Sequence, residues 1–193
     1  IPWYDGTRFA KESDIVTVTI NYRLGALGFA RIPGAPTSGI NGILDQIASL
    51  EWVRDNIENF GGDPNNITIA GESAGAFSVA TIMAMNTSTG LFQKAITQSG
   101  AGHHVLSQQH AESAGEMFMT TLSATSLEDA QNKDIQAVLA AQKYVEENAH
   151  EVMDKGQLPF YPSVTNGYLE DHPIILFNKG VSSHIPVLSG TNT

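Results

Sequence analysis

The amino-acid sequence predicts an α/β fold, in which a mostly parallel β-sheet is flanked by helices. Short runs rich in β-branched residues alternate along the chain with longer stretches whose apolar residues recur at helical spacing. This alternation is typical of parallel strands joined by crossover helices. The chain has 193 residues, of which 41% are hydrophobic. That length is enough for a sizeable core, because a chain of about 150 residues already buries roughly 70% of its unfolded surface.

Four strands are predicted from local composition. Residues 14–21 are dominated by β-branched side chains, and residues 66–70 form a short apolar run. Two further strands are predicted over residues 94–98 and 185–189. A loop rich in Gly and Pro is expected over residues 25–42, after the first strand.

The remaining periodic stretches predict helices. Between residues 43 and 57, apolar residues recur at steps of four, three, three and four, which places them on one face of a helix. A second helix is predicted over residues 73–85. Residues 107–157 have helical periodicity and are expected to form an insertion over the sheet, with a helix start at Ser126. The expected organisation is a core in residues 1–102, a helical insertion in residues 103–160 and a return to the core in residues 161–193.

Composition excludes several classes of function. The chain has 10 basic and 20 acidic residues, a formal net charge of −10. Nucleic-acid binding depends on basic residues that neutralise phosphates, so no nucleic-acid partner is expected. No stretch approaches the roughly 20 apolar residues of a membrane span. There is no Cys and no His or carboxylate pattern with ligand spacing, so no metal or cofactor is expected. This composition is compatible with a cytoplasmic or a secreted protein, and with any oligomeric state.

Residues 71–75, Gly-Glu-Ser-Ala-Gly, lie between a predicted strand and a predicted helix. In this setting Gly-x-Ser-x-Gly forms a sharp turn that presents a nucleophilic serine, here Ser73. Glycine on either side is expected to leave room for the neighbouring backbone. Ser73 would lie at a helix N-terminus, where the helix dipole favours negative charge. The N–H of Ala74 would stabilise the oxyanion that forms during acyl transfer. The alternative for the same pattern is an ordinary strand-to-helix turn.

Further motifs surround this one in a fixed order. They are Asn-Tyr-Arg-Leu-Gly at 21–25, Asn-Gly at 41–42, Asp-Gln at 45–46, Trp-Val-Arg-Asp-Asn-Ile at 52–57, Phe-Gly-Gly-Asp-Pro at 60–64, Ile-Thr-Ile-Ala at 67–70, Leu-Phe-Gln-Lys-Ala-Ile at 91–96 and Gln-Ser-Gly at 98–100. Together they resemble the type-B carboxylesterases, and the bacterial para-nitrobenzyl-esterase-like branch more than the animal cholinesterases. The resemblance is dense from residue 3 to about residue 102, weak through the helical middle, and present again at 185–192.

The resemblance implies an α/β-hydrolase fold, partial in this chain, and a Ser–Glu–His catalytic triad. Ser73 would attack a carboxylic ester to give an acyl-enzyme that water then hydrolyses. Glu72 would be the acidic residue beside the nucleophile that faces the substrate. Ser99 matches a family serine whose side chain supports the triad acid. From the residues alone, Glu72 is also compatible with a partly exposed turn residue, and Ser99 with a strand-end hydroxyl bonded to local backbone.

The resemblance also implies groups that these residues do not supply. The family's other oxyanion donors come from a His-Gly-Gly-Gly-like loop that would precede residue 1. The triad acid would fall just beyond Thr193, and the triad His later still. The chain is therefore expected to be an internal fragment that is inactive on its own. In the usual sheet order, the strand leading into the missing loop lies between residues 14–21 and 66–70, which would leave a gap in the sheet.

None of the six histidines has a setting like that of the family's triad His. Two of them lie just after the predicted strand end at residues 99–100, on the side of the sheet where the site is expected, and His172 marks a helix start. Each is interpreted as a surface or turn residue. The six are His103, His104, His110, His150, His172 and His184.

Three functional hypotheses follow. The first is the nucleophile-bearing segment of an enzyme that acts on a small-molecule carboxylic ester. The second is a non-catalytic recognition protein of the cholinesterase-like type, which the presence of Ser73 argues against. The third is a truncated product with a rearranged fold, in which open sheet edges pair into an oligomer.

Overall fold

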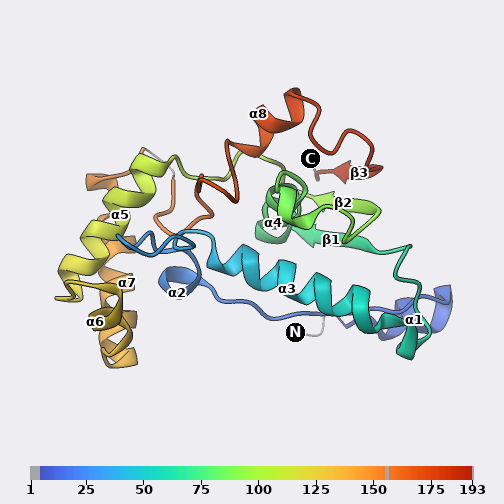
Figure 1. Ribbon diagram of the computed structural model, residues 1–193, viewed down its shortest axis with the longest axis horizontal. Coiled ribbons are helices and arrows are strands. Elements are labelled where there is room, and N and C mark those ends of the chain that lie inside the picture. Colours follow the sequence, from blue (N-terminus) through green and yellow to red (C-terminus); the bar gives the residue numbers. More distant parts are fainter. Residues whose placement is uncertain (1–4, 155–156, 193) are drawn as a thin grey trace.

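The computed structural model describes residues 5–154 and 157–192, and the sheet in this part of the chain has three parallel strands (Figure 1). They are β1 (Thr68–Glu72), β2 (Lys94–Gln98) and β3 (Val187–Gly190), with β2 in the centre. The strand predicted over residues 94–98 is confirmed to the residue. Those predicted over 66–70 and 185–189 begin and end one or two residues later than expected. The parallel order confirms the predicted fold class.

The prediction of a strand over residues 14–21 is wrong. This segment runs alongside α3 (Asn41–Asn56) and forms no strand (Figure 1). Its apolar residues are exposed, from 40% at Ile20 to 50% at Ile15. β-branched composition gives a preference for extended backbone, but a strand also needs a neighbour that accepts and donates its backbone hydrogen bonds. Within the described residues, neither this segment nor the outer edge of β1 has such a neighbour.

Two helices connect the segments around the sheet. α3 extends into a 3-10 turn, η2 (Ile57–Phe60), and buries the apolar stripe that predicted it, including Ile43 and Ile47. α4 (Ala74–Met83) packs against both β1 and β2. The loop expected over residues 25–42 is interrupted by a short helix, α2 (Gly25–Phe29). The remaining short elements here are α1 (Thr7–Ser13) and η3 (Asn86–Ser88).

The helical middle of the chain lies to one side of the sheet, not over it as predicted (Figure 1). It consists of α5 (Gln108–Thr121), α6 (Leu127–Gln131), α7 (Ile135–Asn148) and η4 (Ala149–Glu151). α5 packs on α7, and α7 packs on α2. The helix start at Ser126 is confirmed, since its Oγ accepts a hydrogen bond of 3.1 Å from the N–H of Asp129.

Buried side chains form a main apolar core that joins α2, α3 and α4 to the helical middle. Ile40, Ile43, Val145 and Leu169 are completely buried, and each such side chain contributes about 1.5–3 kcal/mol relative to an exposed one. The last helix, α8 (Pro173–Asn178), begins at His172 as the sequence predicted and contacts α4. Among the described residues, no helix combines the length and apolarity that crossing a membrane requires.

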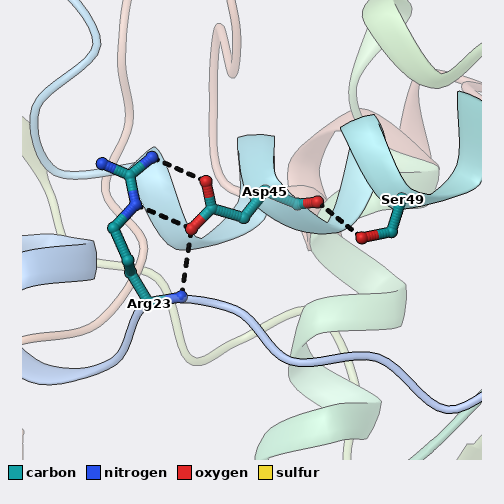
Figure 2. A network of polar contacts seen from close by, with 3 residues as sticks. All are labelled: Arg23, Asp45 and Ser49. Carbon is teal, nitrogen blue, oxygen red and sulfur yellow. Dashed lines mark hydrogen bonds and ion pairs between the residues drawn. The ribbon is translucent and has the colours of Figure 1, made fainter. Parts of the chain in front are cut away.

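An ion pair between Arg23, which follows the segment 14–21, and Asp45 joins this part of the chain to α3 (Figure 2). Arg23 donates to both carboxylate oxygens of Asp45, from Nε at 2.8 Å and from a terminal guanidinium nitrogen at 2.6 Å. The backbone N–H of Arg23 adds a third bond of 3.0 Å, and Ser49 Oγ donates to the Asp45 carbonyl at 2.9 Å. Hydrogen bonds from Arg23 hold the pKa of Asp45 below its ordinary value.

We expect this pair to stabilise the fold only when Asp45 is ionised. The folded-state pKa of Asp45 is depressed, so its contribution is present above the unfolded pKa, near 4, and is lost as pH falls through the folded value. Asp45→Asn should therefore lower the free energy of unfolding of the intact protein by about 1 kcal/mol at pH 7, a value reduced for the exposure of Arg23. Chemical denaturation at several pH values measures this, and the difference should shrink toward pH 3.

Asp55→Asn is the matched control, because Asp55 pairs with the neighbouring Arg54 at an exposed site. It should change stability less than Asp45→Asn does at neutral pH. A difference between wild type and Asp45→Asn that stays constant from pH 7 to pH 3 would contradict the assignment.

Candidate active site

Ser73 occupies a strained turn between β1 and α4. Its backbone has φ of 51° and ψ of −115°, a region that residues other than Gly rarely adopt and that surrounding structure must enforce. Two hydrogen bonds enforce it here. The N–H of Ser73 donates to the carbonyl of Gln98 in β2 at 2.9 Å, and the carbonyl of Ser73 accepts from the N–H of Phe77 in α4 at 3.1 Å. The turn is thus attached to both the sheet and the helix.

Gly71 permits this turn sterically. A Cβ added to Gly71 would lie 2.2 Å from the carbonyl carbon and oxygen of Gly75, a distance that two non-bonded atoms cannot share. A Cβ added to Gly75 would meet no described atom within 4 Å. The expectation that both glycines leave room for neighbouring backbone is therefore correct for Gly71 and wrong for Gly75 within the described residues.

A third glycine, Gly100, belongs to the Gln-Ser-Gly motif of the sequence, which assigned it no role of its own. A Cβ there would lie 2.7 Å from Ala76 Cβ and 2.9 Å from the carbonyl oxygen of Ser73. The chain leaving β2 therefore packs directly on the first turn of α4. The Gln-Ser-Gly motif carried a signal for this position, but only the packing shows why a side chain is excluded.

The four candidate site residues all lie at the carboxyl ends of the parallel strands, the edge at which α/β sheets bind ligands. Glu72 is the last residue of β1, and Ser99 directly follows β2. Ser73, Ala74, Glu72 and Ser99 are all exposed. Ala74 is the first residue of α4, so its N–H has no intrahelical acceptor and is free to bind an anion.

Ser99, which follows the adjacent strand, shares the positive φ of Ser73. It has φ of 55°, and its N–H donates to the carbonyl of Gly190 at the end of β3, at 2.8 Å. Among the described residues, neither its hydroxyl nor that of Ser73 makes a hydrogen bond. The alternative that the Ser99 hydroxyl is bonded to local backbone is therefore not observed.

The histidines divide into two groups. His103 and His104 follow Gly100 and contact the ring of Phe77 in α4. The other four lie elsewhere: His110 in α5, 3.8 Å from a carboxylate oxygen of Asp154; His150 in η4; His172 before α8; and His184 before β3. In the described part of the chain, no histidine is hydrogen-bonded to Ser73. Nor does that part contain a cluster of three or more His, Cys, Asp or Glu side chains that could hold a metal.

Comparison with known proteins gives a consistent result. The model of the family described as "Carboxylesterase family" matches residues 2–193. Para-nitrobenzyl esterase of Bacillus subtilis (strain 168) is 37% identical over 98% of this chain, and an acetylcholinesterase of Myxine glutinosa is 34% identical over 98%. A solved structure of "PNB esterase" superposes on the whole chain with a TM-score of 0.92 and 37% identity.

The chain spans only part of these proteins. It covers 39% of the length of the Bacillus subtilis relative, 57% of the Myxine glutinosa relative and 41% of the solved structure. The matched structures are α/β-hydrolase esterases.

Proposed function

The chain belongs to the carboxylesterase family, and from this premise we propose that it supplies the nucleophile, Ser73, of a carboxylic ester hydrolase. The observation that carries the proposal is the conformation of Ser73. A non-glycine residue is held at φ of 51° between a strand and a helix, with its side chain exposed at the carboxyl edge of the sheet. Strain of this kind is costly and is concentrated at functional sites.

In this proposal, Ser73 Oγ attacks the carbonyl carbon of the ester and forms a new C–O bond. The carbonyl oxygen becomes an oxyanion, to which the free N–H of Ala74 donates. Collapse of this intermediate breaks the bond to the alcohol, which leaves with a proton. Water then attacks the acyl-enzyme, releasing the carboxylic acid and regenerating Ser73. The proton lost by Ser73 needs a base, and the resemblance assigns that role to a histidine oriented by an acid.

Glu72 and Ser99 have supporting roles in the proposal. Glu72, exposed at the end of β1, would face the bound ester beside the nucleophile. Ser99 holds its hydroxyl at the same edge, one strand away, where it would donate to the triad acid. We further propose that the triad acid, the triad His and the second oxyanion donors come from residues outside these 193.

It follows that the 193-residue chain alone should be a very poor catalyst. A serine hydroxyl without a base is a weak nucleophile. In subtilisin, loss of the catalytic histidine alone lowers kcat by about 10⁶-fold. Strong, Ser73-dependent hydrolysis of p-nitrophenyl butyrate by the isolated chain would contradict this part of the proposal.

Covalent labelling tests the role of Ser73. The intact protein is treated with a fluorophosphonate, which phosphonylates an activated serine, and the labelled peptide is identified by mass spectrometry. Labelling is expected on Ser73, to be absent in Ser73→Ala and to persist in Ser123→Ala. Absence of labelling in the intact wild-type protein, or labelling of another serine, would overturn the proposal and favour a non-catalytic recognition role.

A further inference from the structure

Four ring side chains meet beside the first turn of α4. The rings of Phe77 and His104 are stacked, with centroids 3.9 Å apart and planes at 14°. Tyr161 meets His104 edge-on at 5.5 Å and 72°, and His103 lies 5.4 Å from His104. The edge-to-face contact of Tyr161 with His104 is a favourable geometry, because it matches the positive edge of one ring to the negative face of another.

This ring cluster (Phe77, His103, His104 and Tyr161) adjoins Ser73. Phe77 lies one helical turn after Ser73, and its N–H donates to the Ser73 carbonyl at 3.1 Å. A Cβ on Gly100 would lie 2.9 Å from both the Phe77 ring and the Ser73 carbonyl oxygen. His103 and His104 follow Gly100 in the chain. The ring cluster therefore borders the nucleophile turn at the carboxyl edge of the sheet.

The ring cluster is accessible to a ligand. His103 is exposed, and the other three side chains are half-buried. Burial, and to a lesser extent the neighbouring His103, lowers the pKa of His104, which favours the neutral form of this imidazole. Burial raises the pKa of Tyr161, which favours its protonated hydroxyl. The flat faces and edges of these rings can pack against another flat ring.

We propose that the ring cluster determines specificity, with His103 and His104 contacting an aromatic group of the substrate and favouring esters that carry an aromatic group over wholly aliphatic esters. The inference rests on the function proposed above, since it concerns the ester that Ser73 attacks. An aromatic ring packed on these rings gains stacking energy that an alkyl chain of similar size does not. Phe77 and Tyr161 would hold the two imidazoles in place from α4 and from the segment after the helical middle.

The test compares selectivity in the intact protein. The ratio of kcat/KM is measured for phenyl acetate against ethyl acetate, which differ in the alcohol, and for methyl benzoate against methyl butyrate, which differ in the acyl group. In His103→Leu, we expect the ratio of the aromatic to the aliphatic substrate to fall about threefold to tenfold in at least one pair, the factor that one aromatic contact supplies. His103→Phe should restore the ratio. His104→Leu should lower it as well.

The ratio of kcat/KM values distinguishes a change in specificity from a loss of folded protein, because a loss of folded protein lowers the rates for both substrates equally. His184→Leu is the matched control: His184 is exposed like His103 but precedes β3, at the opposite edge of the sheet, and its ratios should equal those of wild type. Ser73-dependent turnover with both ratios unchanged in His103→Leu and His104→Leu would overturn this inference alone. Absence of any Ser73-dependent turnover would overturn the proposed function and this inference with it.

Discussion

Replacing Ser73 with Ala should lower the kcat/KM of the intact protein for p-nitrophenyl butyrate by about 10⁴-fold to 10⁶-fold, the range seen when one member of a catalytic triad is removed. Ala lacks the oxygen that forms the acyl-enzyme, so only binding and the oxyanion donors remain to accelerate attack by water. Stability should change little, because the Ser73 hydroxyl makes no hydrogen bond among the described residues. Steady-state kinetics and thermal unfolding of the same preparations measure both effects.

The control shares the positive φ of Ser73 but lies outside the site. Ser123 is an exposed serine with φ of 53°, in the turn after α5 and away from the strand ends. Both substitutions place Ala at a positive φ, so the cost of that φ for a residue with a side chain is common to them. Ser123→Ala should keep wild-type activity. Comparable activity in Ser73→Ala and wild type would mean that Ser73 is not the nucleophile.

Local patterns predicted elements that depend on interactions within a few residues. The helix start at Ser126 and the apolar stripe of α3 depend on capping and periodicity, and both are observed. The strand at residues 94–98 was predicted from its composition, and it forms because β1 and β3 pair with it on its two sides. The segment 14–21 has the same local preference as a strand, yet it forms none, because pairing depends on a neighbour far away in sequence. The position of residues 107–157 beside the sheet was likewise decided by packing on α2, which periodicity does not encode.

The same distinction between local patterns and distant contacts applies to the candidate site. Ser73 could be identified from the sequence because the strained turn, its flanking glycine and the helix start are contiguous. Phe77, Gly100 and Tyr161 could not, since their importance arises from contacts between segments distant in the chain. An aromatic residue four positions after Ser73 is the one local signal for the ring cluster, and it is also compatible with an ordinary core residue.

Gly71→Ala should be the most destabilising single change in the site. The added Cβ would lie 2.2 Å from the backbone of Gly75, and backbone atoms fixed between β1 and α4 cannot rotate away as a side chain can. Overpacking a core costs about 1–3 kcal/mol even where side chains can adjust, so we expect a loss of about 3 kcal/mol in the free energy of unfolding. Relief of the contact would separate α4 from β1 and displace Ser73, so activity should fall as well.

Gly75→Ala tests whether the contact, and not simply the loss of a glycine, causes this effect. Neither glycine has a positive φ, so neither substitution is penalised by backbone conformation. At Gly75 the Cβ meets no described atom within 4 Å, and Ala is favoured over Gly in a helix by about 0.5–1 kcal/mol. In urea denaturation of the intact proteins, the free energy of unfolding of Gly71→Ala should therefore be well below that of wild type. The value for Gly75→Ala should lie within about 1 kcal/mol of wild type. Equal losses at the two positions would show that the close approach of Gly71 to Gly75 is not what limits this turn.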